Sequence, residues 1–150
     1  MYRTRVPFTI MLAAAAALLL APRGALAQDA PAPGPVPEIT PDFDSPRTGY
    51  DPKHTPKITA PDTVKAGEWF DVTIEIGDGA RHPSLAEHAV MWIALYKDQV
   101  EISRAYLHPV FSTPKVTFSI RLDKTATLRA LEAPNHTAHW EASRKVTVTQ

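Results

Sequence analysis

The stretch Glu68-Trp69-Phe70-Asp71-Val72-Thr73-Ile74-Glu75-Ile76 decides the fold class of this chain. From Phe70 to Ile76 an apolar residue recurs at every second position, and acidic or hydroxyl side chains stand between them. Successive side chains of a β-strand point to opposite faces, so this period of two predicts a strand with one buried face. The same alternation in Lys115–Leu122 predicts a second half-buried strand.

Five further short segments have strand character and are bounded by turn residues: Lys57–Ala60, Val90–Lys97, Val100–Leu107, Thr125–Glu132 and Ser143–Thr149. No long segment has the period of an amphipathic helix. About seven short strands in about 100 residues predict an all-β fold, an immunoglobulin-like antiparallel β-sandwich. This architecture hosts many activities, so the function has to be inferred from particular residues.

The first 27 residues have the pattern of a secretory signal peptide. Arg3 and Arg5 precede an apolar run from Ile10 to Ala21, and Ala25-Leu26-Ala27 provides a site for signal peptidase. The apolar run is shorter than the roughly 20 residues that span a bilayer. We therefore expect cleavage after Ala27, no membrane anchor in the mature protein, and a periplasmic or otherwise exported location.

Residues 28–50 are rich in proline and contain few apolar side chains. Such a segment buries too little surface to offset its conformational entropy, which predicts a disordered arm. The folded domain is then expected to cover residues 51–150.

Composition excludes several classes of function. The chain has 16 Lys plus Arg and 16 Asp plus Glu, and removal of residues 1–27 takes away three arginines, which leaves a net charge of about −3. This balance argues against a nucleic-acid partner. With no cysteine there can be no disulfide, thiolate nucleophile or iron–sulfur cluster, so any metal must be held by nitrogen and oxygen ligands.

Five of the six histidines fall in three predicted loops: His54 in one, His82 and His88 in the next, and His136 and His139 in the last. Loops at one end of a sandwich can converge, and imidazole ligates several transition metals. This pattern predicts a site for one transition metal ion per chain. Ordinary surface histidines are the alternative interpretation.

Three stretches carry a resemblance to a known family: Lys53-His54-Thr55-Pro56-Lys57-Ile58, Ala60–Glu68, and His82-Pro83-Ser84-Leu85-Ala86-Glu87-His88 with Met91-Trp92-Ile93. In this order and separation they resemble the iron domain of the superoxide reductases, neelaredoxin and desulfoferrodoxin. The resemblance covers about 100 residues and ends in Trp140–Val146.

The resemblance implies an immunoglobulin-like sandwich that holds one iron through four equatorial His and an axial Cys and reduces superoxide to peroxide. By position, His54, His82 and His88 correspond to three of the equatorial ligands. Lys53 corresponds to the catalytic cation that attracts superoxide. The expected partner is superoxide or a small redox partner.

The chain also departs from the family pattern in its last loop. The family has Cys six residues and His three residues before the Trp, whereas this chain has Pro134 and Thr137 at those distances from Trp140. The favoured fourth ligand is therefore His136, with His139 as the alternative. The Glu that often precedes Lys-His in the family is Pro52 here.

Without a thiolate the site no longer selects strongly for iron, and the Irving–Williams order favours copper for an all-imidazole site loaded outside the cytoplasm. A cysteine-free copper-binding redox or copper-handling protein is the first alternative function. The second is a metal-free partner protein, since Ala105–Val110 and the two following strands resemble the Z subunit of the thiosulfate-oxidation carrier. Such a protein would have no use for His54, His82 and His88 together. Catalysis and homo-oligomer formation are left open.

Overall fold

A computed structural model describes residues 45–150, so the predicted signal peptide and most of the predicted arm lie outside the described residues. Residues 45–150 contain no helix that is long and apolar enough to cross a membrane. The described chain forms eight strands: β1 (Pro56–Thr59), β2 (Thr63–Lys65), β3 (Trp69–Ile76), β4 (Val90–Lys97), β5 (Val100–Tyr106), β6 (Lys115–Arg121), β7 (Ala126–Pro134) and β8 (Trp140–Thr149).

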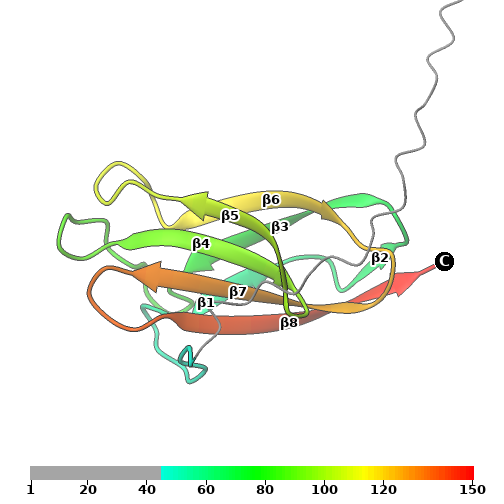
Figure 1. Cartoon of the computed structure of the whole chain (residues 1–150), viewed down its shortest axis with the longest axis horizontal. Coiled ribbons are helices and arrows are strands. Elements are labelled where there is room, and N and C mark those ends of the chain that lie inside the picture. The colour runs from blue at the N-terminus through cyan, green and yellow to red at the C-terminus, as the bar shows by residue number, and fades with distance from the viewer. Residues whose placement is uncertain (1–44) are drawn as a thin grey trace, which may run out of the picture. The chain divides into compact units, whose positions relative to one another are not determined.

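These strands form two sheets, of order β1-β3-β6 and β2-β8-β7-β4-β5, which confirms the all-β sandwich (Figure 1). The seven predicted segments are all strands. The eighth, β2, runs parallel to β8, with Thr63 opposite Thr147 and Lys65 opposite Thr149. Three residues are too few to show a period, and the partner strand lies more than 80 residues away, so β2 left no signal in the sequence.

The alternating apolar residues face each other across the two sheets. Val72, Ile74 and Ile76 of β3 are fully buried and belong to one core with Ile93 and Leu95 of β4 and with Leu128 and Ala130 of β7. Removal of these side chains from water is the main driving force for joining the sheets. The apolar residues whose alternation predicted the sandwich are therefore the same residues that stabilise it.

The folded unit extends upstream of the predicted boundary at Asp51. Arg47 lies beside the start of β8, where its N–H donates to the His139 carbonyl and its carbonyl accepts from the Glu141 N–H, both at 2.9 Å. These bonds satisfy backbone groups at the β8 edge. Part of the segment predicted as an arm is thus attached to the sheet.

Strand direction brings the predicted ligand loops to one end of the sandwich (Figure 1). This end holds the starts of β1, β4 and β8 and the ends of β3 and β7. The histidines precede or follow these strand ends in the sequence, so the topology gathers them.

Candidate metal centre

Four histidines meet at this end of the molecule: His54, His82, His88 and His136. One ring nitrogen of each lies within 4.8 Å of the corresponding nitrogen of every other. The two Nε2 atoms of His54 and His136 are 3.1 Å apart, and the rings of His88 and His136 stack with centroids 3.7 Å apart. Residues separated by up to 82 positions in the sequence thus surround one small space.

A tight turn before β1 positions His54. The Asp51 Oδ1 atom accepts hydrogen bonds from the backbone N–H of Lys53 at 2.8 Å, the backbone N–H of His54 at 3.0 Å and the His54 Nδ1 at 2.9 Å. The Asp51 N–H donates in turn to the Thr55 hydroxyl at 2.8 Å. An ionised carboxylate can only accept, so Nδ1 carries the proton and the Nε2 lone pair of His54 faces the other histidines.

The loop after β3 positions His82. Gly77 adopts a φ of 93°, and a Cβ at this position would collide with the Ala80 carbonyl oxygen, so the chain reverses here only with glycine. The His82 Nδ1 donates to the Pro83 carbonyl at 2.8 Å. Its Nε2 is buried and has no hydrogen-bond partner within residues 45–150.

Asn135 ties the loop of His88 to the loop of His136. Its side-chain Oδ1 accepts from the Ala89 N–H at 3.0 Å, and its Nδ2 donates to the Ala86 carbonyl at 2.9 Å. Its backbone N–H donates to the Ala89 carbonyl at 3.0 Å. Because Asn135 precedes His136 and Ala89 follows His88, these three bonds hold the two stacked rings in register.

Trp140 closes one side of the cluster. Its ring stacks on that of His54 with centroids 5.6 Å apart and an interplanar angle of 16°, and the Arg47 guanidinium lies over the indole at 5.4 Å from the centroid. Trp140 is 8% exposed. A cation over a tryptophan face is a favourable contact that keeps the indole in place.

His139 lies apart from this cluster. Its ring packs against that of Trp92 at an interplanar angle of 71° with centroids 5.3 Å apart, and it does not belong to the group of converging nitrogens. The structure therefore brings His136, and not His139, to the other three. Lys53 is exposed beside His54, and its backbone N–H is bound by Asp51.

The residues present fit a metal ion with nitrogen ligands. A metal–imidazole bond is about 2.1 Å long, so two nitrogens on opposite sides of one ion are about 4.2 Å apart, which agrees with the 4.8 Å limit of this cluster. The Nε2 atoms of both His82 and His88 are buried without a hydrogen-bond partner among the described residues. Buried polar atoms are normally satisfied, and a metal ion would satisfy these two lone pairs.

The electrostatics of the cluster favour neutral imidazoles. Burial lowers the pKa of His82 to about 4, although its bond to the Pro83 carbonyl acts in the opposite direction. Burial and the neighbouring His88 and His54 also lower the pKa of His136. A neutral ring keeps the lone pair that a metal needs, so the site is prepared for ligation at neutral pH.

One buried acid near the site was missed by the sequence analysis. Glu132 is fully buried, and neither carboxyl oxygen has a hydrogen-bond partner among the described residues. Burial raises its pKa to about 9, with a smaller contribution from the charge of Asp51. The period-two pattern of β7 could have revealed this acid, because Glu132 stands two residues after Ala130 and therefore on the same inward face of the strand.

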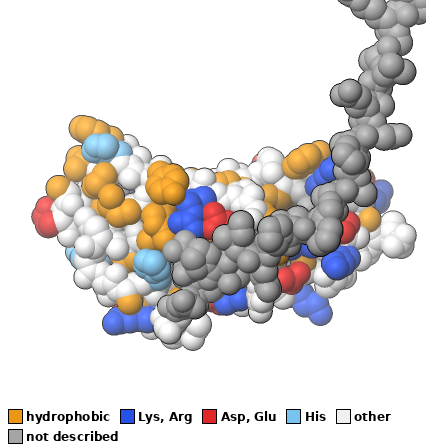
Figure 2. Space-filling view, in the orientation of Figure 1, with side chains coloured by type: hydrophobic (Ala, Val, Ile, Leu, Met, Phe, Trp, Pro, Cys, Tyr) orange, Lys and Arg blue, Asp and Glu red, His pale blue; other side chains and the backbone are white. Residues whose placement is uncertain are grey.

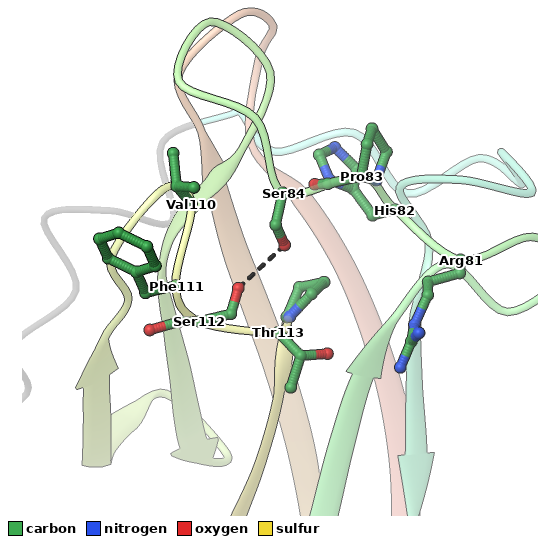
Figure 3. A pocket seen from close by; sticks show the side chains of 9 residues that line it. Arg81, His82, Pro83, Ser84, Val110, Phe111, Ser112 and Thr113 are labelled. Atoms are coloured by element: carbon green, nitrogen blue, oxygen red, sulfur yellow. Dashed lines mark hydrogen bonds between the residues drawn. The ribbon is translucent and has the colours of Figure 1, made fainter.

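A shallow pocket of about 280 Å³ adjoins the loop of His82. Figure 3 shows the Ser84 hydroxyl donating to the Ser112 carbonyl, at 2.9 Å, between the loops that contribute Phe111 and Arg81. Phe111 is 87% exposed, and Figure 2 shows hydrophobic side chains gathered at this end of the molecule. The cluster thus has an apolar surface next to it.

The fold and the site define a class of protein: a small β-sandwich that gathers a multi-histidine metal site at one end. The sequence model of the desulfoferrodoxin family matches residues 47–143, and the chain belongs to this family.

Known proteins agree with this placement. The chain is 29% identical over 112 residues to the neelaredoxin of Megalodesulfovibrio gigas, which covers 63% of this chain and 86% of that protein. A solved superoxide reductase (neelaredoxin) from Ignicoccus hospitalis is 36% identical, with a TM-score of 0.59, and covers 64% of this chain and 81% of its own. The solved superoxide reductase from Nanoarchaeum equitans is 27% identical, with a TM-score of 0.57. This match covers 68% of the present chain and 100% of the Nanoarchaeum equitans chain.

Glu132 makes stability depend on pH in a defined window. Its carboxyl keeps a proton in the folded metal-free protein up to about pH 9 and loses it near pH 4.5 in the unfolded chain. The unfolded state therefore binds fewer protons, and the free energy of unfolding falls as pH rises, by at most about 1.4 kcal/mol per pH unit. His82 acts in the opposite direction only below about pH 6.5, so the range from 6.5 to 9 isolates Glu132.

We expect urea unfolding of the metal-free protein to show this decline from pH 6.5 to 9, and Glu132→Gln to flatten it. Glu87→Gln, at an exposed position, is the matched control and should keep the decline. A Glu132→Gln profile parallel to that of the unsubstituted protein would show that the buried carboxyl is not the titrating group.

Proposed function

We propose that this chain is an exported protein that binds one transition metal ion through His54, His82, His88 and His136 and uses it to reduce superoxide. Two observations carry the proposal: one ring nitrogen from each of the four histidines converges within 4.8 Å, and the Nε2 atoms of His82 and His88 are buried and unsatisfied within residues 45–150. The desulfoferrodoxin family match and the superoxide reductases among the relatives support the substrate.

Residues of this chain would have distinct roles in that reaction. Superoxide gains one electron and two protons to give hydrogen peroxide, and a bound redox-active ion would supply the electron. His136 is exposed, so it leaves one side of the cluster accessible from solvent, whereas His82 is 1% exposed and anchors the inner side. The ammonium group of Lys53 would raise the local concentration of the anion.

The donor set lacks the thiolate that the family resemblance implies. A sulfur anion on the metal lowers its potential and assists loss of the product, and four imidazoles supply no such charge. We therefore propose that superoxide reduction by this chain is slower than by a homologue with the cysteine. The same donor set leaves copper as a second metal, although the family points to iron.

Metal uptake tests the site itself. Protein isolated from the periplasmic fraction, with Gln28 expected as its first residue, should take up one equivalent of Cu(II) or Fe(II) in dialysis. The double variant His82→Ala/His88→Ala should lose stoichiometric uptake, because both buried nitrogens are removed. Affinity should also weaken at acidic pH, where protons compete for imidazole, and the lowered pKa values of His82 and His136 should shift this loss to lower pH than for free histidine.

The matched control is His108→Ala/His139→Ala, which removes two histidines outside the cluster. It should retain one equivalent of metal. Equal uptake by both double variants would refute the four-histidine site.

Reaction with superoxide tests the activity. Ferrous protein exposed to a pulse of superoxide should be oxidised with release of one peroxide per iron. Lys53→Met should slow the second-order step and remove part of its dependence on ionic strength, because the step draws on electrostatic attraction. A rate equal to that of a cysteine-containing neelaredoxin would contradict the argument from axial donation.

Competition between metals tests which ion the site prefers. With equimolar Cu(II) and Fe(II), we expect copper to occupy the site and to give an electron paramagnetic resonance spectrum with splittings from three or four nitrogens. No thiolate charge-transfer band should appear with either metal, because the chain has no cysteine. Retention of iron with exclusion of copper would mean that the pocket imposes a geometry that overrides intrinsic affinity.

A further inference from the structure

The four-histidine cluster has no anionic member. The group of converging ligand atoms contains only imidazole nitrogens, and no carboxylate of the described residues belongs to it. Glu132 is the fully buried acid of this region, and its carboxyl oxygens belong neither to this group nor to any hydrogen bond within residues 45–150. An ion bound by four neutral rings would keep its full positive charge within the protein, and buried charges need a partner.

Among residues 45–150, Asp51 is the carboxylate that hydrogen-bonds to a histidine of the cluster. Its Oδ1 lies 2.9 Å from the His54 Nδ1, on the side of the ring opposite the Nε2 that faces His136. The His54 side chain is 14% exposed and that of Asp51 35%, so the bond is partly shielded from water. Two backbone N–H groups, of Lys53 and His54, hold the same oxygen in place.

We propose that Asp51 is a positioning residue that supplies the negative charge the ligand set lacks, by acting through the His54 ring. Its carboxylate fixes the ring with the Nε2 lone pair directed at the metal, and it increases the electron density that this lone pair donates. It thereby favours the higher oxidation state of a bound ion. This inference rests on the proposed metal site and adds a determinant of affinity and potential that lies outside the ligands.

Two substitutions separate the charge of Asp51 from its shape. Asp51→Asn keeps an oxygen acceptor for the Lys53 and His54 backbone N–H groups, so the turn is retained while the charge is lost. Asp51→Ala removes both. The matched control is Asp62→Asn, which neutralises an aspartate that pairs with Arg144 at 2.8 Å and has a 90% exposed side chain.

The first measurement uses Cu(II) competed against a chelator on the full mature chain. We expect Asp51→Asn to weaken affinity by about 10- to 100-fold, as for other partners of metal-bound histidines, and Asp51→Ala at least as much. The midpoint potential of the bound ion should rise in Asp51→Asn, because the anion that favours the oxidised state is gone. Asp62→Asn should change neither quantity. Unchanged affinity and potential in Asp51→Asn would overturn the inference.

The second measurement needs no metal, so it separates this inference from the proposed function. Nitrogen-15 resonances of metal-free protein should show His54 protonated at Nδ1, and Asp51→Ala should mix the two tautomers while Asp62→Asn leaves them unchanged. If the unsubstituted protein binds no metal, the proposed function fails whatever this experiment shows. If it binds metal but His54 has the same tautomer with and without Asp51, the positioning role fails and the site stands.

Discussion

The constraint on which the site depends is that four imidazoles share a space less than 5 Å across at the end of the sandwich. Neutral rings at this distance can coexist, but charged rings would repel one another strongly in a partly buried space. The pKa of His82, lowered to about 4, reflects this burial and the neighbouring rings. The cost of holding the nitrogens together without partners is offset when an ion occupies the space between them.

In the sandwich, a separate set of hydrogen bonds or a tight turn fixes each loop that carries one of these histidines. The Asp51 turn fixes the ring of His54, and Gly77 allows the reversal that brings His82 inward. Asn135 joins the last two loops through bonds to the backbone on both sides of His88. The four histidines therefore stand on loops that are held by several hydrogen bonds, even though loops are the variable parts of this architecture.

The acidic side chains of this region lie outside the four-histidine group and not within it. Asp51 contacts His54 from the outer side, and Glu132 lies in the interior with its proton retained. The family resemblance implies a thiolate as an axial ligand, and no cysteine exists in this chain to provide one. This member of the desulfoferrodoxin family therefore brings four histidines together with no thiolate among them.

The sequence by itself determined the fold class, since period-two alternation is a local property that survives in any tertiary arrangement. It also determined which ligand types were available, because six histidines and no cysteine are matters of composition. The tertiary structure decided that His136 joins the cluster and His139 packs on Trp92 instead, a choice set by the backbone path of one loop. It likewise decided the pairing of β2 with β8 and the contact of Asp51 with His54. It also decided that the buried Glu132 carboxyl has no hydrogen-bond partner within residues 45–150. These depend on strand register and loop closure between distant residues, which no local pattern encodes.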